Sequence, residues 1–537
     1  QKRLLSRVQS YYYSDDLSQR LALGSCGARA LPYETLTLAF TAGQLSAVFG
    51  AKLTGLALDT EGGYRAENDL WWRPSGRQIF DDTAFYRPVE VRDPFGNAST
   101  IAYDDYTLLA LSVTDPLGNV SAAAHDYRTL QPTLVTDPNG NRQAAAYDAL
   151  GMLVKVAVMG KSGENDGDTL DDPTIELSYD LDAWVQESAP VSVYTKVREV
   201  HDPQTTLFQQ RYTYSGGMGQ VVLEKTQAEP GLAPERDQNG DLVFNQGELV
   251  FADTSPDLRW IGTGRVIVDN KGNPIKQYEP FFDSAPVYVD EVQLAEWGVT
   301  PLLHYDPLGR LIRTDLPDGT FSKVTFTPWE QLTHDPNDTV LDSDWYAERD
   351  ARTPGTDEND AEIDAAGKAE AHAATPGRSV LDHLGRPFLR VEDNGLDDQQ
   401  DPLLFETRLA LDIEGNTLTV TDARGNVAAT NTFAPGGVQL STDSADAGAR
   451  WTLPSALGAP LRAWDERLHR WRWTYDALNR PTHAYVKHDT DDELLRERTV
   501  YGESLGQSAA DDNHRGQVYA LYDTAGELVF DAYDFKG

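Results

Sequence analysis

Ser504 lies in GESLG (502–506), a match to the G-x-S-x-G motif in which a serine attacks a carbonyl carbon. That chemistry needs a strand before the motif, an apolar helix after it and a histidine base. TVY precedes the motif and fits a strand, but the following QSAADDNHRGQ is polar and turn-like, and His514 is the only downstream histidine. The segment predicts a loop between strands, and we expect no enzyme activity.

A second candidate for chemistry is the acidic stretch DQNGDLVFNQGE (237–248). Four of its side chains match spacings of a calcium-binding loop: Asp237, Asn239, Asp241 and Glu248. The sixth position is Leu242, where the sharp turn requires glycine, and no helical pattern flanks the stretch. A solvated acidic loop is favoured, and calcium stays an alternative.

The remaining chemical signals are weaker. The ten histidines form no H-E-x-x-H pair and no cluster with cysteine, so no zinc site is predicted. A carboxylate pair for glycoside hydrolysis stays open, but 85 acidic residues make any such pair uninformative. The glycine-rich stretches GTGRV (262–266) and SGGMGQ (215–220) lack phosphate-loop spacing and predict turns. We therefore expect no cofactor.

Composition limits the class of protein. The 537 residues exceed what one hydrophobic core supports and carry a net charge of −39, which disfavours binding to nucleic acid or to an anionic membrane surface. Forty per cent hydrophobic residues and 52 aromatics indicate a folded chain. The single cysteine, Cys26, excludes an intrachain disulfide and is expected to be buried. No stretch resembles a membrane span or a signal peptide.

The elements that would position any site come from a repeat. VRDPFGNASTIAYDDY begins at Val91, VTDPLGNVSAAAHDYR at Val113 and VTDPNGNRQAAAYDAL at Val135, a period of 22 residues. The positions that recur are Asp93, Asp115 and Asp137; Gly96, Gly118 and Gly140; Tyr103, His125 and Tyr147; and Asp104, Asp126 and Asp148. His125 stands where its neighbours have tyrosine, so a packing role explains it.

Each repeat predicts a β-hairpin. In DPFG the aspartate can hydrogen-bond the turning backbone, the proline presets φ and the glycine tolerates the fourth position, as in a type I turn. Ser99, Ile101 and Tyr103 then alternate onto one face, and Leu109, Leu111 and Val113 do the same. Stacked hairpins would pair their edges and bury one face continuously.

Degenerate copies continue downstream, beginning near residues 269, 305, 381, 411, 475 and 522. The candidate repeat residues there are Tyr305, Asp306, Gly309, Arg310, Tyr475, Asp476, Tyr522, Asp523 and Gly526. NDAEIDAAGKAEAHAA (359–374) is rich in Ala and Glu and closed by Pro376 and Gly377, so it predicts the one sizeable helix of an otherwise β chain.

YDPLGRL (305–311) resembles the YD, or RHS, repeat, and the periodic series makes that resemblance specific. Several longer stretches resemble the B component (TcB) of bacterial insecticidal toxin complexes: 85–100, 258–282, 316–330, 338–350 and 515–537. Together they span nearly the whole chain. The resemblance is to the C-terminal half of that component.

The resemblance implies an all-β fold in which YD-repeat hairpins form a curved strip of a hollow shell, with a small helical insertion. In that family the B and C components complete the shell, and the cytotoxic C-terminal segment of the C component is enclosed. The implied partners are a C component, or a downstream RHS core, with its toxin cargo. The pore-forming A component would be reached through an upstream region that this sequence does not contain. The implied location is a secreted, extracellular complex.

Six segments are expected on this basis. They are a β-rich lead-in continuing from an upstream segment (1–90), YD repeats of 22-residue period (91–160), a β region with acidic insertions (161–260), YD repeats (261–345), a helical insertion (346–378) and YD repeats that continue past the end (379–537).

A YD-repeat cell-surface protein that binds carbohydrate or protein through exposed aromatics is the alternative function. The position of the aromatics separates the two, because a shell buries them in its sheet and a lectin stacks several in an exposed groove. WDERLHRWRWTYD (464–476) is the best place to look, and we expect Trp464, Trp471 and Trp473 to pack.

Overall fold

The computed structural model describes residues 4–201, 207–237, 241–264, 266–277, 280–288 and 300–537. Strands hold 47% of the structure and helices 10%, so the prediction of a mainly β chain is confirmed. The chain divides into two compact units, which are described in turn. Unit 1 comprises Gln1–Asp172 and Ala410–Gly537, and unit 2 comprises Pro173–Leu409. The six-segment division stays a prediction.

Unit 1 begins with a four-stranded antiparallel sheet in the order β1-β2-β4-β3. Its strands are β1 (Val8–Tyr12), β2 (Pro32–Thr41), β3 (Arg65–Glu67) and β4 (Leu70–Pro74). Helix α1 (Ala42–Phe49) and the 3-10 helix η1 (Gly50–Leu53) connect β2 to β3. The Thr41 hydroxyl caps α1 by accepting a hydrogen bond from the backbone N–H of Gln44 at 3.1 Å.

Two meanders complete unit 1, each built of strands that pair antiparallel with their chain neighbours. The first has β5 (Arg77–Asp81), β6 (Arg87–Arg92), β7 (Ala98–Tyr103), β8 (Ala110–Thr114), β9 (Val120–Asp126), β10 (Gln131–Thr136), β11 (Asn141–Tyr147) and β12 (Leu153–Lys161). The second has β32 (Thr417–Thr421), β33 (Val427–Phe433), β34 (Gln439–Ser444), β35 (Gly448–Pro454), β36 (Pro460–Asp465), β37 (His469–Tyr475), β38 (Pro481–His488), β39 (Leu494–Tyr501), β40 (Val518–Tyr522) and β41 (Glu527–Val529), with the 3-10 helix η3 (Gly502–Ala510) between β39 and β40. The prediction of two strands per 22-residue repeat is confirmed.

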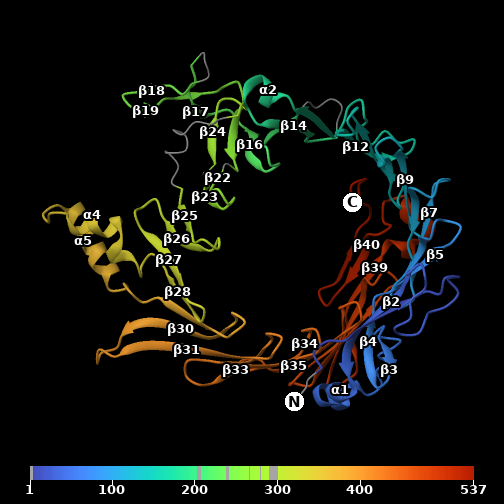
Figure 1. Cartoon of the computed structure of the whole chain (residues 1–537). Coiled ribbons are helices and arrows are strands. Elements are labelled where there is room, and N and C mark those ends of the chain that lie inside the picture. Colours follow the sequence, from blue (N-terminus) through green and yellow to red (C-terminus); the bar gives the residue numbers. More distant parts are fainter. Residues whose placement is uncertain (1–3, 202–206, 238–240, 265, 278–279, 289–299) are drawn as a thin grey trace. The chain divides into compact units, whose positions relative to one another are not determined.

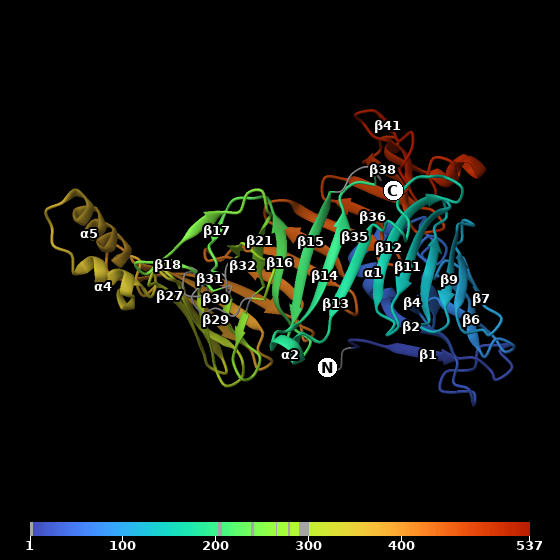
Figure 2. The same cartoon turned by 90° about the horizontal axis from the view of Figure 1, so that it is seen from above.

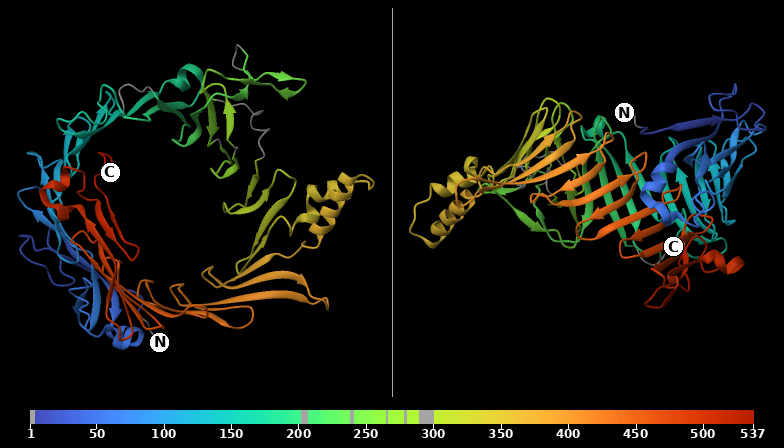
Figure 3. Two further views of the ribbon diagram at one scale, coloured as in Figure 1. Left: turned by 180° about the vertical axis from the view of Figure 1, so that it is seen from behind. Right: turned by 90° about the horizontal axis from the view of Figure 1, so that it is seen from below.

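The core of unit 1 joins segments far apart in sequence. Phe40, Leu45 and Phe49 of β2 and α1 pack with Leu440 and Leu453 of β34 and β35. Figure 1 shows α1 beside β4 and β35, and in Figure 3 the red C-terminal strands lie beside the blue N-terminal ones. The first sheet and α1 therefore pack against the second meander, which lies about 400 residues further along the chain.

Unit 2 is also built of antiparallel meanders. Its first run pairs β13 (Ile175–Asp180), β14 (Val191–Arg198), β15 (Phe208–Ser215), β16 (Val221–Ala228), β21 (Arg259–Thr263) and β24 (Phe281–Asp283). Its second run pairs β22 (Val266–Val268), β23 (Pro274–Gln277), β25 (Leu302–Tyr305), β26 (Leu311–Asp315), β27 (Phe321–Phe326), β28 (Glu330–His334), β29 (Gly377–Leu381), β30 (Pro387–Leu396) and β31 (Pro402–Leu411), the last of which ends in unit 1. Two small ladders are β17 (Leu232–Pro234) with β20 (Phe251–Asp253), and β18 (Phe244–Asn245) with β19 (Glu248–Leu249).

Among the described residues of unit 2, the helices are α2 (Ala183–Glu187), the 3-10 helix η2 (Val340–Asp342), α4 (Asp344–Asp350) and α5 (Asp357–Glu370). Helix α5 confirms the predicted helix and begins two residues earlier, because Thr356 is its N-cap and accepts from the backbone N–H of Asn359. It ends at Glu370, four residues short of the predicted end. Figure 2 shows α4 and α5 projecting from the neighbouring strands of this unit.

The expected continuously buried face is wrong for the first meander. Val91, Leu111, Val113 and Val135 share a face with Ile101, because the register places Ile101 opposite Val113 and Val135 opposite Ala123. Those four side chains are 38–41% exposed. We call Val91, Ile101, Leu111, Val113 and Val135 the apolar face. Pairing hairpin edges satisfies the backbone, but a face is buried only when a second layer packs on it.

The expectation that Cys26 is buried is also wrong, because its side chain is exposed. It lies in the loop between β1 and β2, where GSCGARA forms turns that leave no core position for a small side chain. Among the described residues, no helix combines the length and the apolar character needed to cross a membrane.

Candidate functional site

The three D-P-x-G-N turns share one hydrogen-bond pattern. The Oδ1 atom of Asp93 accepts from the backbone N–H groups of Phe95 and Asn97, both at 2.9 Å, and its Oδ2 atom accepts from the Asn97 side chain at 2.9 Å. Asp115 and Asp137 repeat these bonds with their own following residues. One aspartate thus saturates the donors of a five-residue turn.

The glycines of these turns need a left-handed backbone. Gly96, Gly118 and Gly140 have φ of +90°, +83° and +93°, which side chains disfavour. A β-carbon at Gly118 would meet nothing within 4 Å. The reason for glycine is therefore the backbone dihedral and not a side-chain clash.

The Tyr-Asp turns use the same pattern with arginine in place of asparagine. Asp306 accepts from the backbone of Leu308 and Arg310, and the Arg310 Nε donates to its Oδ2 at 2.7 Å. Asp476 does the same with Leu478 and Arg480. Simpler versions occur at Asp104, Asp126, Asp148 and Asp523. Gly309 and Gly526 also have positive φ, and Tyr305 and Tyr522 end β25 and β40.

The repeat tyrosines link neighbouring strands. The hydroxyl of Tyr103 donates to the Pro88 carbonyl at 3.0 Å, that of Tyr147 to Pro132 at 2.9 Å and that of Tyr475 to Pro460 at 2.7 Å. Each acceptor lies 15 residues before its tyrosine. His125 has no hydroxyl, and its buried Nδ1 atom has no hydrogen-bond partner among the described residues.

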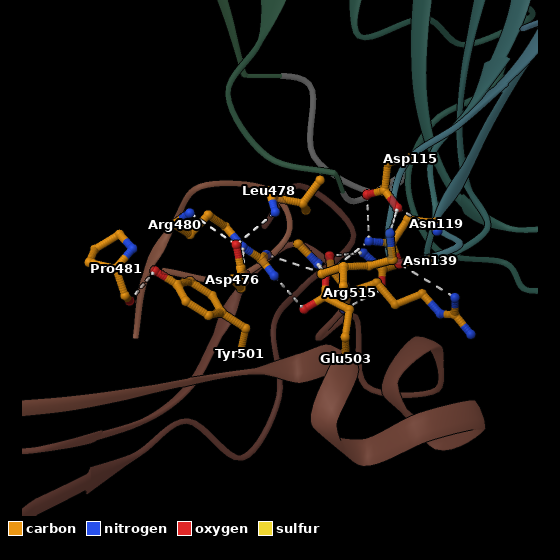
Figure 4. A network of polar contacts seen from close by, with 12 residues as sticks. Asp115, Asn119, Asn139, Asp476, Leu478, Arg480, Pro481, Tyr501, Glu503 and Arg515 are labelled. Carbon is orange, nitrogen blue, oxygen red and sulfur yellow. Dashed lines mark hydrogen bonds and ion pairs between the residues drawn. The ribbon is translucent and has the colours of Figure 1, made fainter. Parts of the chain in front are cut away.

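The turns of the first meander meet the C-terminal segment in a set of polar contacts that we call the polar seam (Figure 4). The Asn119 amide donates to Glu503 at 2.9 Å, and Asn139 exchanges two hydrogen bonds with the Arg515 backbone at 2.9 and 3.0 Å. Asn141 reaches Asn513 at 3.0 Å. Asn479 reaches the turn aspartate Asp93 at 2.9 Å. The seam therefore fastens the second meander to the turns of the first.

Glu503 is the charged centre of the seam. It pairs with the Arg480 guanidinium at 3.0 Å and accepts from the backbone N–H of Gly516 at 2.9 Å. Burial tends to raise the pKa of this carboxyl, but the hydrogen bonds from Arg480, Asn119 and Gly516 outweigh it and hold the pKa below its usual value. The carboxylate stays ionised and bound.

GESLG forms the start of η3. Glu503 makes contacts of the polar seam, and Ser504 is exposed. His514 is buried at 2% exposure, its Nε2 atom lies 3.0 Å from the Asp531 carbonyl oxygen, and its ring contacts Tyr519 and Tyr533 edge-on. No hydrogen bond joins Ser504 to a histidine in the described part of the chain. The geometry required for nucleophilic attack is therefore not assembled here.

The described part of the acidic stretch, Asp237 and residues 241–248, includes the short hairpin of β18 and β19. The backbone N–H of Asp241 donates to Asp237 at 3.0 Å, and Glu248 begins β19. Asn239 lies outside the described residues. Within the ranges that the structure describes, no group of three or more His, Cys, Asp or Glu side chains is arranged to hold a metal.

The three tryptophans of the best lectin candidate do not form one platform. Trp464 belongs to the hydrophobic core and lies 5.7 Å from Phe49 between ring centroids. Trp471 and Trp473 are half-buried on β37. Since Trp464 lies opposite Arg470, its side chain emerges on the face opposite to theirs.

Two features of the site were not predicted from the sequence. The asparagines Asn97, Asn119 and Asn141 also recur every 22 residues and close the turns, and Asn119 and Asn141 contact the seam as well, so the period itself could have found them. Glu503 carried no such signal, because its partners lie up to 384 residues away.

No protein-family model and no curated protein sequence matches the chain. Solved structures do. A crystal structure of TcdB2-TccC3 superposes with a TM-score of 0.82 at 23% identity over 99% of this chain, and one without the hypervariable C-terminal region superposes with 0.80 at 22% over 99%. A Photorhabdus luminescens Tc holotoxin pore gives 0.83 at 21% over 99%. The chain spans 26–28% of the length of those chains. Along its whole length, the chain has the fold found in these toxin-complex structures.

Proposed function

We propose that this chain is a structural, non-enzymatic segment of a secreted toxin complex, part of an RHS-repeat shell that encloses a cytotoxic polypeptide. The observation that carries the proposal is the likeness to the TcdB2-TccC3 structures over 99% of the chain. Hairpin repeats closed by Asp turns, tyrosine links and a polar seam are the features that a structural wall requires. Its partner would be a C component, or a downstream RHS core, that carries the cargo.

The apolar face supports an enclosing role. Val91, Leu111, Val113 and Val135 present adjacent apolar side chains over neighbouring strands, and the described residues leave them 38–41% exposed. Apolar surface of this kind marks a place where another polypeptide packs. An unfolded cargo exposes the complementary apolar side chains.

Co-expression with the cognate downstream segment and limited proteolysis test the proposal. We expect a stable complex in which the cargo resists protease while a tag fused to the N-terminus is cut. Free cargo is the matched control and should be digested quickly. Digestion of the cargo at the same rate in the complex would contradict the enclosing role.

A glycan array on the purified chain distinguishes the carbohydrate-binding alternative. The shell role predicts no saturable glycan binding. Binding that is lost on Trp473→Ala would favour the surface-protein function instead.

A further inference from the structure

A cleft of about 230 Å³ in unit 1 lies between η1 and strands β36, β37 and β38. Its charged lining consists of Lys52, Arg462, Arg470, Arg472, Lys487 and a single acid, Glu493. The whole chain carries a net charge of −39. A concentration of positive charge in one small cleft is therefore opposite in sign to the rest of the molecule.

The strand register places cations directly opposite one another. Arg462 on β36 pairs with Arg472 on β37, and Arg470 on β37 pairs with Lys487 on β38. Because side chains alternate along a strand, all four project from the same face. Like charges directly opposite on neighbouring strands destabilise a sheet. Pairs of like charges that lower the stability of a sheet are typical of positions that serve a function.

Carboxylates neutralise only part of this charge. Arg462 pairs with Glu61, and Arg472 makes a two-pronged pair with Glu493, with Nε to Oε1 at 3.0 Å. Lys52 lies over the Trp451 ring at 4.0 Å from its centroid. Among the described residues, no carboxylate forms an ion pair with Lys52, Arg470 or Lys487. Three cations of the cleft thus remain available to a ligand.

The surroundings strengthen an interaction with an anion. Trp464, which lines the cleft, is 6% exposed and belongs to the hydrophobic core. Burial lowers the pKa of the Arg462 guanidinium, and the nearby Arg472 lowers it further, in opposition to Glu61. Partly desolvated cations gain more from a bound anion than fully solvated ones do.

We propose that this cleft binds a small polyvalent oxyanion of the phosphate class, held by Arg470, Lys487 and Lys52 and flanked by Arg462 and Arg472. Guanidinium groups match phosphate oxygens with paired N–H donors, and lysine supplies point charges. Apart from Glu493, all charged groups that line the cleft are hydrogen-bond donors, which suits a ligand rich in acceptors. The proposal does not depend on the shell role.

A compact ion fits better than an acidic chain. The cleft has a volume of only about 230 Å³, which suits a small ligand. The net negative charge of the chain repels an extended polyanion. A nucleic acid or an acidic peptide would have to cross that repulsive field along its whole length.

Isothermal titration calorimetry of the purified chain with sodium pyrophosphate, at constant ionic strength set by KCl, tests the site. We expect saturable binding with a stoichiometry near one. The double substitution Arg470→Gln/Lys487→Gln should weaken it about tenfold or more, since it removes two charge-assisted donors. Arg424→Gln/Arg467→Gln removes two exposed arginines outside the cleft and should change the affinity less than about twofold.

Thermal denaturation gives a second readout that a purely structural role would not produce. Without anion, the cleft variant should melt at or above the temperature of the parent chain, because it removes a like-charged pair. Pyrophosphate should raise the melting temperature of the parent and not that of the variant. The single Lys487→Gln is measured alongside, so that a folding defect in the double variant leaves the test intact.

Three results would overturn the proposal. They are equal pyrophosphate affinity in the cleft and control variants, a pyrophosphate-induced rise in melting temperature that is as large in the Lys487→Gln variant as in the parent, and pentaglutamate binding more tightly than pyrophosphate. The last would assign the cleft to an acidic peptide.

Discussion

At the scale of single residues, the fold depends on a few side chains that each satisfy several backbone donors. Asp93, Asp115 and Asp137 each accept three hydrogen bonds within their own turn. A turn closed in this way needs no core beneath it. That explains how hairpins with half-exposed faces remain ordered.

Gly118→Val should destabilise the chain by about 1–3 kcal/mol, because valine must adopt the unfavourable φ of +83°. Gly367→Ala is the control. That glycine lies within α5 and has no positive φ, so alanine should stabilise by about 0.5–1 kcal/mol. Urea denaturation measures both, and an unchanged midpoint for Gly118→Val would contradict the structural role of the repeat glycine.

His125→Tyr should stabilise the chain by about 0.5–1.5 kcal/mol by restoring the interstrand hydrogen bond that its neighbours make. The acceptor is the Ala110 carbonyl, since Ala110 stands where Pro88 and Pro132 stand in the adjacent repeats. Tyr147→Phe removes the equivalent bond and should shift the melting temperature the other way. Equal shifts of both variants in one direction would refute the assignment.

Ser504→Ala should leave melting temperature and ester hydrolysis unchanged, because Ser504 is exposed and has no histidine partner in the described residues. The assay uses p-nitrophenyl acetate with the parent chain as control. An esterase activity of the parent that disappears in the variant would show that GESLG is a catalytic elbow.

At the scale of elements, the sequence predicted what is local and missed what is distant. The hairpins, the turn glycines and α5 follow from spacing and composition, because the interactions that form them span few residues. The polar seam joins residues 376 and 384 apart, and no local pattern encodes such contacts. The burial of Cys26 was mispredicted for a related reason, since burial depends on which layer covers a loop.

Glu503→Gln should lower stability by about 1–3 kcal/mol near neutral pH, because the charged pair with Arg480 is lost from a side chain that is 14% exposed. Glu406→Gln, from a pair whose side chains are 42% and 63% exposed, is the control and should change stability by less than about 0.5 kcal/mol. Chemical denaturation at neutral pH measures both.

The same carboxyl gives the seam a pH dependence. Its folded pKa lies below the ordinary value of 4.5, so its contribution is complete above that value and is lost as the pH falls through the folded pKa. The stability difference between parent and Glu503→Gln should therefore shrink on acidification. A difference that stays constant from neutral pH down to about pH 3 would contradict the role of the ionised carboxylate.

At the scale of the whole molecule, the chain consists mainly of antiparallel meanders. The larger of the two hydrophobic core clusters among the described residues lies in unit 1. Leu440 and Leu453 are fully buried where the N-terminal sheet meets β34 and β35, whereas the apolar face of the first meander stays partly exposed. Apolar side chains that the described residues leave about two-fifths exposed contribute less to the stability of the chain than fully buried ones do. Their presence instead favours contact with another polypeptide.

Leu111→Ser/Val113→Ser should cost about 1–2 kcal/mol for each substituted side chain in the isolated chain, because these residues are 39% and 41% exposed. Leu453→Ala, at 0% exposure, is the contrast and should cost about 2–5 kcal/mol. The Leu111/Val113 variant should also bind less of a hydrophobic dye and leave more of the cargo open to protease in the co-expressed complex. If the cost for each side chain instead equals that of Leu453→Ala, the face belongs to the chain's own core and does not receive another polypeptide.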